Sequence, residues 1–207
     1  AYRDIKSENL LLDWKGYLKV IDLGFARYLD DGWCFTFCGT PEYMAPELVV
    51  CRPHTHAVDW WALGVLLYEM LLGNSPFSSG GGEEPNEKIY ARILAYRARG
   101  AKASPPLPLC CFNADAADLI RKLLVVDPAG RLNPKQIMGH PFFEGLDFLK
   151  LEQRVLPTPF KPKVDGDLSH LEDFESSDEE DDDMSASHRS RRRLNSARRN
   201  SASVGPR

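Results

Sequence analysis

Hydrophobic and polar positions follow two kinds of pattern along the chain, and together they predict a mainly α-helical domain with a small β-hairpin. Two short apolar runs, residues 10–12 and 17–21, flank a turn at residues 13–16 and predict a pair of strands. Residues 57–72 are apolar on nearly every side, which is typical of a buried helix. The Gly- and Pro-containing segment 73–76 then ends this helix.

Three later stretches also carry helical patterns, at residues 87–99, 115–126 and 134–138. Asn113 and Asp115 stand near the start of the second stretch, and the side chain of either one is suited to cap its first turn. We therefore expect a hairpin, a long loop and four helices in this order.

Two segments lack any sustained periodicity and predict loops. Residues 24–47 are rich in Gly, Pro and polar side chains, and ordered loops of this length are usually functional. Residues 78–85 contain three consecutive glycines and predict a flexible insert. This insert is not a phosphate-binding loop, because no strand leads into it and it lacks the G-x-G-x-x-G spacing.

Composition changes sharply near the C-terminus. Of the 207 residues 43% are hydrophobic, which is enough for a core, but large apolar residues become rare after Glu172. The net charge of −4 conceals an acidic run at residues 178–183 and a basic stretch at 189–199. Blocks of like charge with few apolar residues are typical of solvated, disordered tails.

The five cysteines are odd in number and show no metal-binding spacing, which indicates a reducing compartment. The sequence contains neither a signal peptide nor an apolar run of membrane-spanning length. We expect a cytoplasmic protein with no membrane partner. The basic tail leaves a nuclear-localisation or nucleic-acid patch open, although nucleic acid is the less favoured partner.

The strongest chemical signal is at the start of the chain, in the run Tyr-Arg-Asp-Ile-Lys-Ser-Glu-Asn at residues 2–9. It places a candidate base, Asp4, two residues before a cation, Lys6. Asn9 and Asp22, the latter in an Asp-Leu-Gly run, are oxygen ligands of the type that Mg²⁺ prefers. Phosphoryl transfer needs this combination of groups.

Two further motifs follow, at residues 39–47 (Gly-Thr-Pro-Glu-Tyr-Met-Ala-Pro-Glu) and 59–65 (Asp-Trp-Trp-Ala-Leu-Gly-Val). With these motifs in order, the chain resembles the large, C-terminal lobe of a eukaryotic protein kinase of the AGC group, of the cyclic-nucleotide-dependent type. The resemblance implies a large lobe, truncated at its N-terminus, over residues 1–143. An AGC-type tail would follow over residues 144–175, and a disordered acidic-then-basic tail over 176–207.

The resemblance also implies catalytic roles. Asp4 would accept or orient the substrate hydroxyl, Lys6 would lie against the transferred phosphate, and Thr40 would bridge the two. ATP and Mg²⁺ are the implied cofactors. Asn9 and Asp22 would hold the metal, and the residues implied to contact the cofactor are Leu11 at the floor of the adenine pocket, Lys6, Asn9 and Asp22. The alternative, that Asp4 and Asp22 are ordinary turn carboxylates, does not explain the order of the motifs.

Other residues would support or regulate the site. Thr36 matches the activation-loop phosphosite, whose phosphate would pair with Arg3, although an unmodified loop threonine is the alternative. Glu47 and Arg131 would form a buried structural ion pair. Asp59, a carboxylate within an apolar helix, must find hydrogen-bond donors, and the resemblance assigns it the main-chain amides of the catalytic loop.

Substrate preference is implied by two sets of residues. Glu8, Glu42 and Glu69 would bind arginines upstream of the target. Phe37, Pro41 and Met44 would line an apolar pocket for the residue after the target. The implied substrate is Arg-Arg-x-Ser/Thr in a protein. Ser201, which follows Arg198 and Arg199, fits this pattern and is a candidate autophosphorylation site.

We therefore expect a serine/threonine protein kinase whose ATP-binding small lobe is missing from this chain, so that the fragment alone is inactive. A regulatory subunit or an upstream cyclic-nucleotide-binding domain is a further implied partner. The alternative is a non-catalytic kinase-like lobe that acts as a binding or scaffold module. Upstream sequence with a Gly-rich loop and an ATP-binding lysine would discriminate between the two.

Overall fold

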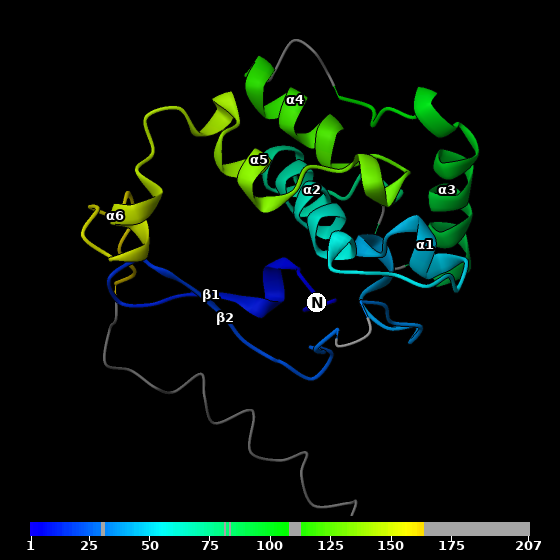
Figure 1. Ribbon diagram of the computed structural model, residues 1–207, viewed down its shortest axis with the longest axis horizontal. Coiled ribbons are helices and arrows are strands. Elements are labelled where there is room, and N and C mark those ends of the chain that lie inside the picture. The colour runs from blue at the N-terminus through cyan, green and yellow to red at the C-terminus, as the bar shows by residue number, and fades with distance from the viewer. Residues whose placement is uncertain (30–31, 81, 83, 108–112, 164–207) are drawn as a thin grey trace, which may run out of the picture. The chain divides into compact units, whose positions relative to one another are not determined.

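One long apolar helix, α2 (Ala57–Leu72), lies at the centre of the helical part of the fold (Figure 1). Its bounds match the range predicted from the sequence. Trp61 and Val65 are fully buried on it, and the helix ends at Gly73, whose amide donates to the carbonyl of Glu69 at 2.7 Å. A helix that is apolar on most sides needs neighbours on most sides.

The computed structural model describes residues 1–29, 32–80, 82, 84–107 and 113–163. The chain divides into two units, residues 1–162 and 163–207, and every helix and strand in the described part belongs to the first. No helix in the described part is long and apolar enough to cross a membrane.

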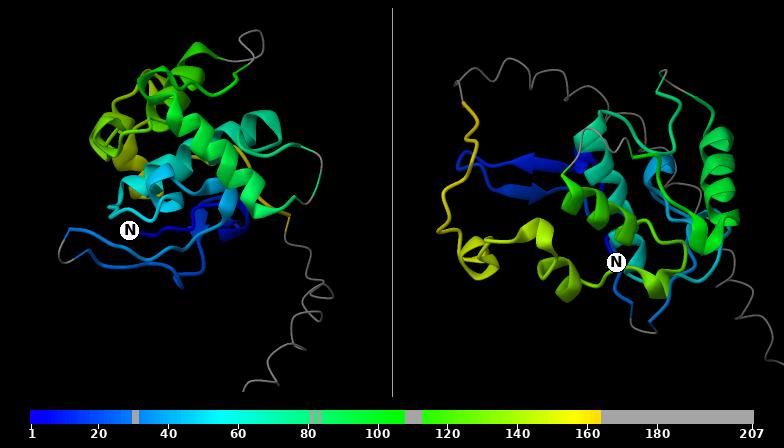
Figure 2. Two further views of the ribbon diagram at one scale, coloured as in Figure 1. Left: turned by 90° about the vertical axis from the view of Figure 1, so that its right-hand side faces the viewer. Right: turned by 90° about the horizontal axis from the view of Figure 1, so that it is seen from above.

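Two other helices complete the core around α2. α4 (Ala114–Leu123) packs directly on α2, and α3 (Asn86–Ala98) contacts the short α1 (Pro46–Val49). The close approach of α2 to α4 requires Gly64, because a Cβ atom there would lie 2.8 Å from the Cβ of Leu123. Figures 1 and 2 show α3 and α4 on different sides of α2.

The predicted helices agree with the structure to within a few residues. The cap of α4 is Asn113, whose Oδ1 accepts a hydrogen bond of 2.8 Å from the amide of Asp115. The remaining elements are the helices α5 (Pro134–Met138) and α6 (Phe148–Glu152) and the 3₁₀ turns η1 (Ser7–Asn9), η2 (Pro41–Tyr43), η3 (Gly100–Lys102), η4 (Pro128–Gly130) and η5 (Pro141–Phe143).

The predicted hairpin is also present. Strands β1 (Leu10–Leu12) and β2 (Leu18–Val20) pair antiparallel, with Leu11 opposite Lys19. Asp13 fixes the turn, because its Oδ1 accepts hydrogen bonds of 2.9 Å from the amides of Lys15 and Tyr17. The expected mainly helical fold with a small β-hairpin is therefore confirmed.

The segment after α6 passes over the hairpin turn, a contact that the sequence patterns did not predict. The hydroxyl of Tyr17 donates to the carbonyl of Leu156 at 2.7 Å, and Thr158 Oγ1 donates to the carbonyl of Lys15 at 2.5 Å. The hairpin is thus held at its turn by residues about 140 positions away. The domain boundaries expected after residue 143 stay a prediction.

Candidate active site

The central helix α2 positions the first residues of the chain through a buried carboxylate, Asp59. Its Oδ2 accepts from the amide of Tyr2 at 2.9 Å, and its Oδ1 accepts from the amide of Arg3 at 2.7 Å. Arg3 has a φ of 71°, a left-handed conformation that costs free energy in a side-chain-bearing residue. The two hydrogen bonds to Asp59 hold this turn, and Asp4 follows it directly.

Asp4 lies at the centre of a hydrogen-bond network and is only 6% exposed. Its Oδ1 accepts from both the amide and the hydroxyl of Thr40, at 3.1 and 2.8 Å. Its Oδ2 accepts from Asn9 Nδ2 at 2.8 Å and lies 3.4 Å from Lys6 Nζ. Lys6 Nζ also donates to Thr40 Oγ1 at 3.1 Å, so the structure brings together four of the residues singled out in the sequence.

These contacts determine the charge of Asp4. Burial by itself raises the pKa of the carboxyl, but hydrogen bonds from Thr40 and Asn9 and the charge of Lys6 outweigh it. The pKa of Asp4 therefore lies below its ordinary value. The carboxylate is ionised at neutral pH, which suits a group that orients a hydroxyl.

The loop predicted over residues 24–47 approaches this network through Gly39. Gly39 has a φ of 110°, and a Cβ atom there would lie 2.8 Å from the carbonyl oxygen of Arg3. A larger residue would push the segment away from residues 3 and 4. Gly39 thus allows Thr40 to reach Asp4.

A main-chain hydrogen bond links the segments that carry the two candidate metal ligands, Asn9 and Asp22. The amide of Ile21 donates to the carbonyl of Asn9 at 3.0 Å, so Asp22 follows the residue that is bonded to Asn9. Asp22 is exposed, has a φ of 57° and uses Oδ1 to accept from the amide of Gly24 at 2.8 Å.

The side-chain nitrogen of Asn9, Nδ2, donates to Asp4, so the side-chain oxygen of Asn9, Oδ1, is the atom suited to a metal. Carboxylate and amide oxygens are hard donors that fit Mg²⁺. Within the described part of the chain no three His, Cys, Asp or Glu side chains are grouped to enclose a metal. Mg²⁺ is usually held by one or two protein oxygens, with phosphate oxygens and waters completing its octahedral shell.

Leu11, the expected floor of the adenine pocket, lies in β1 with 52% of its surface exposed. The neighbouring apolar side chains of the hairpin, Leu12, Leu18 and Val20, are about equally exposed. Leu11 pairs with Lys19 and therefore lies on the opposite face of the hairpin from these three side chains. The adenine role of Leu11 stays a prediction.

Arg3 and Thr36 are linked through a third residue, Cys34. Arg3 Nη1 donates to Cys34 Sγ at 3.0 Å, and the thiol lies 3.7 Å from Thr36 Oγ1. Cys34 is buried, yet hydrogen bonds from Thr36 and the charges of Arg3 and Arg27 bring the pKa of its thiol below the ordinary value. Thr36 itself is exposed, and its hydroxyl is one side chain away from the Arg3 guanidinium.

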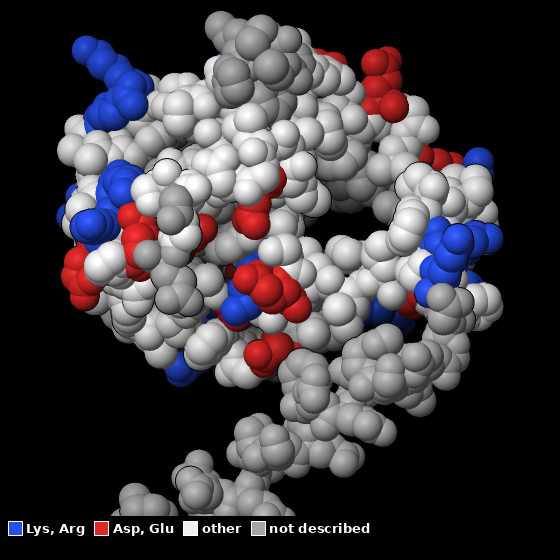
Figure 3. All heavy atoms as spheres, turned by 180° about the vertical axis from the view of Figure 1, so that it is seen from behind, with Lys and Arg blue, Asp and Glu red and all other residues white. Residues whose placement is uncertain are grey.

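The three glutamates expected to bind arginine line one cavity of about 460 Å³ that also reaches Thr40. They are Glu8, Glu42 and Glu69. Burial, followed by the charges of Glu69, Glu84 and Glu8, raises the pKa of Glu42. Figure 3 shows acidic side chains gathered near the middle of one face of the molecule.

Glu84 is a member of this cavity that sequence reasoning missed. It forms a bidentate pair with Arg92 on α3, at 2.6 and 2.9 Å, and its side chain is 9% exposed. The segment 78–85 was expected to be a flexible insert, but this pair anchors one of its ends. An i, i+8 pair across a loop has no periodic signal, so the sequence pattern could not reveal it.

Comparison with known proteins identifies the family to which this arrangement belongs. Residues 1–143 match the protein kinase domain family. The chain is a member of the protein kinase family. The AGC-type resemblance read from the motifs is confirmed, because the relatives include cAMP-dependent kinases and a ribosomal protein S6 kinase.

Three relatives illustrate the similarity. The cAMP-dependent protein kinase catalytic subunit PRKX of Mus musculus is 42% identical over 185 residues, which cover 86% of the chain and 48% of the relative. The cAMP-dependent protein kinase type 3 of Saccharomyces cerevisiae is 39% identical over 181 residues, 84% of the chain and 42% of the relative. The ribosomal protein S6 kinase alpha-4 of Mus musculus is 41% identical over 176 residues, 81% and 22% respectively. The chain thus spans less than half the length of these relatives.

The kinase-family ion pair between Glu47 and Arg131 is buried and well formed. Arg131 Nη1 and Nη2 donate to the two Glu47 oxygens at 2.6 and 2.7 Å. Arg131 also donates to the carbonyls of Ala57 and Val125, at 2.9 and 2.8 Å. Its charge is therefore fully satisfied, and it joins α1, α2 and the loop after α4.

The apolar substrate pocket expected from the kinase resemblance stays a prediction. Phe37 is 48% exposed and packs edge-on against Tyr90, and Pro41 lines the acidic cavity. Met44, however, is 2% exposed and belongs to the core. Sequence alone does not distinguish an apolar loop residue that lines a pocket from one that packs in the core.

The remaining candidate, Ser201, lies outside the described residues, as do Arg198 and Arg199. The acidic run at 178–183 and the basic stretch at 189–199 lie outside them too. Autophosphorylation at Ser201 stays a prediction.

Proposed function

We propose that the protein to which this chain belongs is a serine/threonine kinase that transfers the γ-phosphate of ATP to hydroxyls preceded by arginines. The observation that carries this proposal is the arrangement of Asp4, whose carboxylate is ionised and fixed by Thr40, Asn9 and Lys6. The cavity that Thr40 lines also contains three glutamates, Glu8, Glu42 and Glu69. A hydroxyl-orienting group and an arginine-binding surface thus adjoin.

In the proposed reaction Asp4 accepts a hydrogen bond from the substrate hydroxyl and points its oxygen at the γ-phosphorus. A new O–P bond forms, the bond from the γ-phosphorus to the bridging oxygen breaks, ADP leaves and Asp4 takes the hydroxyl proton. Because the pKa of Asp4 is low, it orients the hydroxyl more than it activates it before transfer.

Lys6 faces both Asp4 and Thr40 and is the cation nearest the hydroxyl, so it would offset charge on the transferring phosphoryl group. Asn9 and Asp22 would hold Mg²⁺, which when bound neutralises the phosphate oxygens. Thr40 holds Lys6 and Asp4 in place relative to each other, because its hydroxyl accepts a hydrogen bond from Lys6 and donates one to Asp4.

Arginine selectivity follows from charge. Glu8, Glu42 and Glu69 share one cavity, and burial, followed by the negative charges of Glu69, Glu84 and Glu8, raises the pKa of Glu42, so a positive charge there would be favourable. A substrate guanidinium would supply it through bidentate hydrogen bonds.

We propose further that this unit acts as the large lobe, that an ATP-binding small lobe lies elsewhere in the protein, and that a regulatory subunit or cyclic-nucleotide-binding domain controls it.

The test uses the full-length protein, ³²P-labelled ATP and two peptides, Leu-Arg-Arg-Ala-Ser-Leu and its analogue with both arginines replaced by alanine. We expect label on the serine of the first peptide and at least about tenfold less on the second. Binding of the arginine peptide without any transfer would favour a non-catalytic binding module. Equal labelling of both peptides would contradict the arginine preference.

A further inference from the structure

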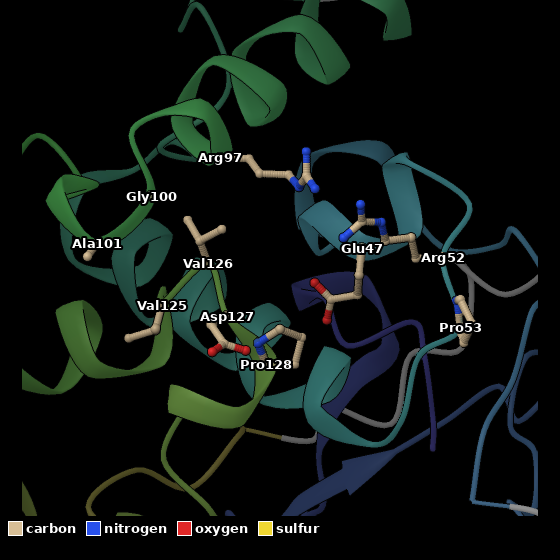
Figure 4. Close-up of a pocket in the computed structure, with 10 residues that line it drawn as sticks. All are labelled: Glu47, Arg52, Pro53, Arg97, Gly100, Ala101, Val125, Val126, Asp127 and Pro128. Carbon is tan, nitrogen blue, oxygen red and sulfur yellow. The ribbon is translucent and has the colours of Figure 1, made fainter.

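A second cavity, of about 480 Å³, lies outside the candidate active site, and two arginines converge on it. Arg52 follows α1 and Arg97 lies near the end of α3. Figure 4 shows the two guanidinium groups directed toward the same space, from different elements. We call this space the Arg52–Arg97 cleft.

Neither arginine has an ion-pair partner among the residues that the structure describes. Glu47 also lines the cleft, but both of its oxygens are bound by Arg131. Asp127 stands on the opposite side of the cleft in Figure 4 and uses Oδ1 to accept from the amide of Ala129 at 3.1 Å. Because Glu47 is neutralised by Arg131, the two arginines and Asp127 leave the cleft with an excess of positive charge, which favours an incoming anion.

The rest of the wall is apolar. Val125, Val126, Pro53 and Pro128 also line the cleft. The carbonyls of Val125 and Val126 accept from Arg131, so the main chain there is already satisfied. A ligand that fills the cleft would place an anionic group at the arginines and an aliphatic group on the valines.

From this combination we infer that the Arg52–Arg97 cleft is a docking site for an acidic segment of a partner protein, with a Glu or Asp carboxylate between the arginines and an aliphatic side chain on Val125 and Val126. Carboxylates bind guanidinium groups bidentately, which gives such a contact direction as well as charge. Inorganic phosphate fits less well, because it would leave the apolar wall uncovered. The inference does not rest on the proposed kinase function, since the cleft shares no residue with the Asp4 network.

The test measures binding of a defined probe to the full chain by fluorescence anisotropy. The probe is the fluorescein-labelled peptide Glu-Glu-Leu-Val-Asp-Glu, and its two analogues replace Leu-Val by Ser-Ser or every acid by its amide. Arg52→Glu combined with Arg97→Glu removes the proposed site. Arg121→Glu is the matched control, because Arg121 lies on α4, has no ion pair among the described residues and does not line the cleft. Thermal unfolding of each variant checks that the fold is retained.

We expect the probe to bind the unmodified chain and the Arg121→Glu variant alike, and the double variant at least about tenfold more weakly. Both analogues should also bind more weakly, and salt should weaken binding. Three results would overturn the inference: no binding of the probe, equal binding by the double variant, or displacement by inorganic phosphate together with no loss from the Ser-Ser change. The last result would indicate a simple anion site.

Discussion

The Oδ1 atom of Asp59 accepts a hydrogen bond of 2.7 Å from the main-chain amide of Arg3. Through this contact the central helix, which contributes no group to the proposed phosphoryl transfer itself, determines where Asp4 stands. The neighbouring amide of Tyr2 binds the other oxygen of the same carboxylate at 2.9 Å. The site and the core of the fold are therefore coupled through one side chain.

Asp59→Ala should destabilise the protein strongly. The substitution leaves two main-chain amides without partners next to a buried helix, and each such loss costs about 1–3 kcal/mol, so the free energy of unfolding should fall by about 2–6 kcal/mol. Urea denaturation of the chain measures this. Glu87→Ala, at an exposed position of α3, is the control and should change the free energy by less than about 0.5 kcal/mol. Equal effects of the two changes would show that Asp59 is not a structural acceptor.

The Glu47–Arg131 pair should behave as a coupled unit. Removing either partner leaves an uncompensated buried charge, so Glu47→Gln and Arg131→Met should each cost about 3–5 kcal/mol of the free energy of unfolding. The double substitution removes both charges and should cost clearly less than the sum. A double-mutant cycle by urea denaturation gives these values, and strict additivity would contradict the coupling.

Sequence patterns predicted the elements of this fold well where local physics decides them. The bounds of α2 were evident because an apolar run ends at Gly73, which adopts the left-handed φ of 79° that glycine tolerates. The hairpin was evident because Asp13 and Gly16 form its turn. α6 was not predicted, because five residues held by one capping aspartate, Asp147, leave too short a pattern.

The site was predicted by motif and not by pattern, and this difference explains what was missed. Asp4, Lys6 and Asn9 stand in one motif, so their proximity was foreseeable. The Glu84–Arg92 pair and the contact of Arg3 with Cys34 belong to no motif and depend on how loops fold. The burial of Met44 depends on tertiary packing, which loop sequence does not reveal.

Replacing Glu42 by Gln should stabilise the protein near neutral pH but weaken its binding of an arginine-containing peptide. Burial and the charges of Glu69, Glu84 and Glu8 raise the pKa of Glu42, so its ionised form is disfavoured in the folded state. The resulting destabilisation is fully present above the raised pKa and disappears as the pH falls below the ordinary glutamate pKa. Glu42→Gln should therefore raise the thermal unfolding midpoint near neutral pH, and the gain should shrink toward acidic pH.

The same variant should bind an Arg-Arg peptide more weakly, which isothermal titration calorimetry can measure. Glu87→Gln, which lies outside the acidic cavity, should change neither quantity. A Glu42→Gln variant that is less stable at neutral pH, or that binds the peptide as well as the unmodified chain, would contradict the assigned environment and role.

Thr36→Ala should lower kinase activity of the full-length protein, and the loss should depend on Arg3. A phosphate on Thr36 carries close to two negative charges, and the Arg3 guanidinium lies just beyond Cys34. If the phosphate acts through Arg3, then Arg3→Ala combined with Thr36→Ala should lose no more activity than the larger single loss. Activity losses that multiply in the double variant would mean that the two residues act independently.

The most direct test of the proposed function is phosphoryl transfer by Asp4→Asn in the full-length protein, measured together with ATP binding. The variant retains the size of the side chain but loses the ability to accept the hydroxyl proton, so turnover should fall by about 10²–10⁴-fold while Mg²⁺-dependent ATP affinity stays unchanged. Asp22→Asn should also abolish turnover but should weaken ATP binding, which separates the two roles. Near-normal turnover of Asp4→Asn, with the fold intact, would contradict the assignment of Asp4 as the residue that orients the substrate hydroxyl.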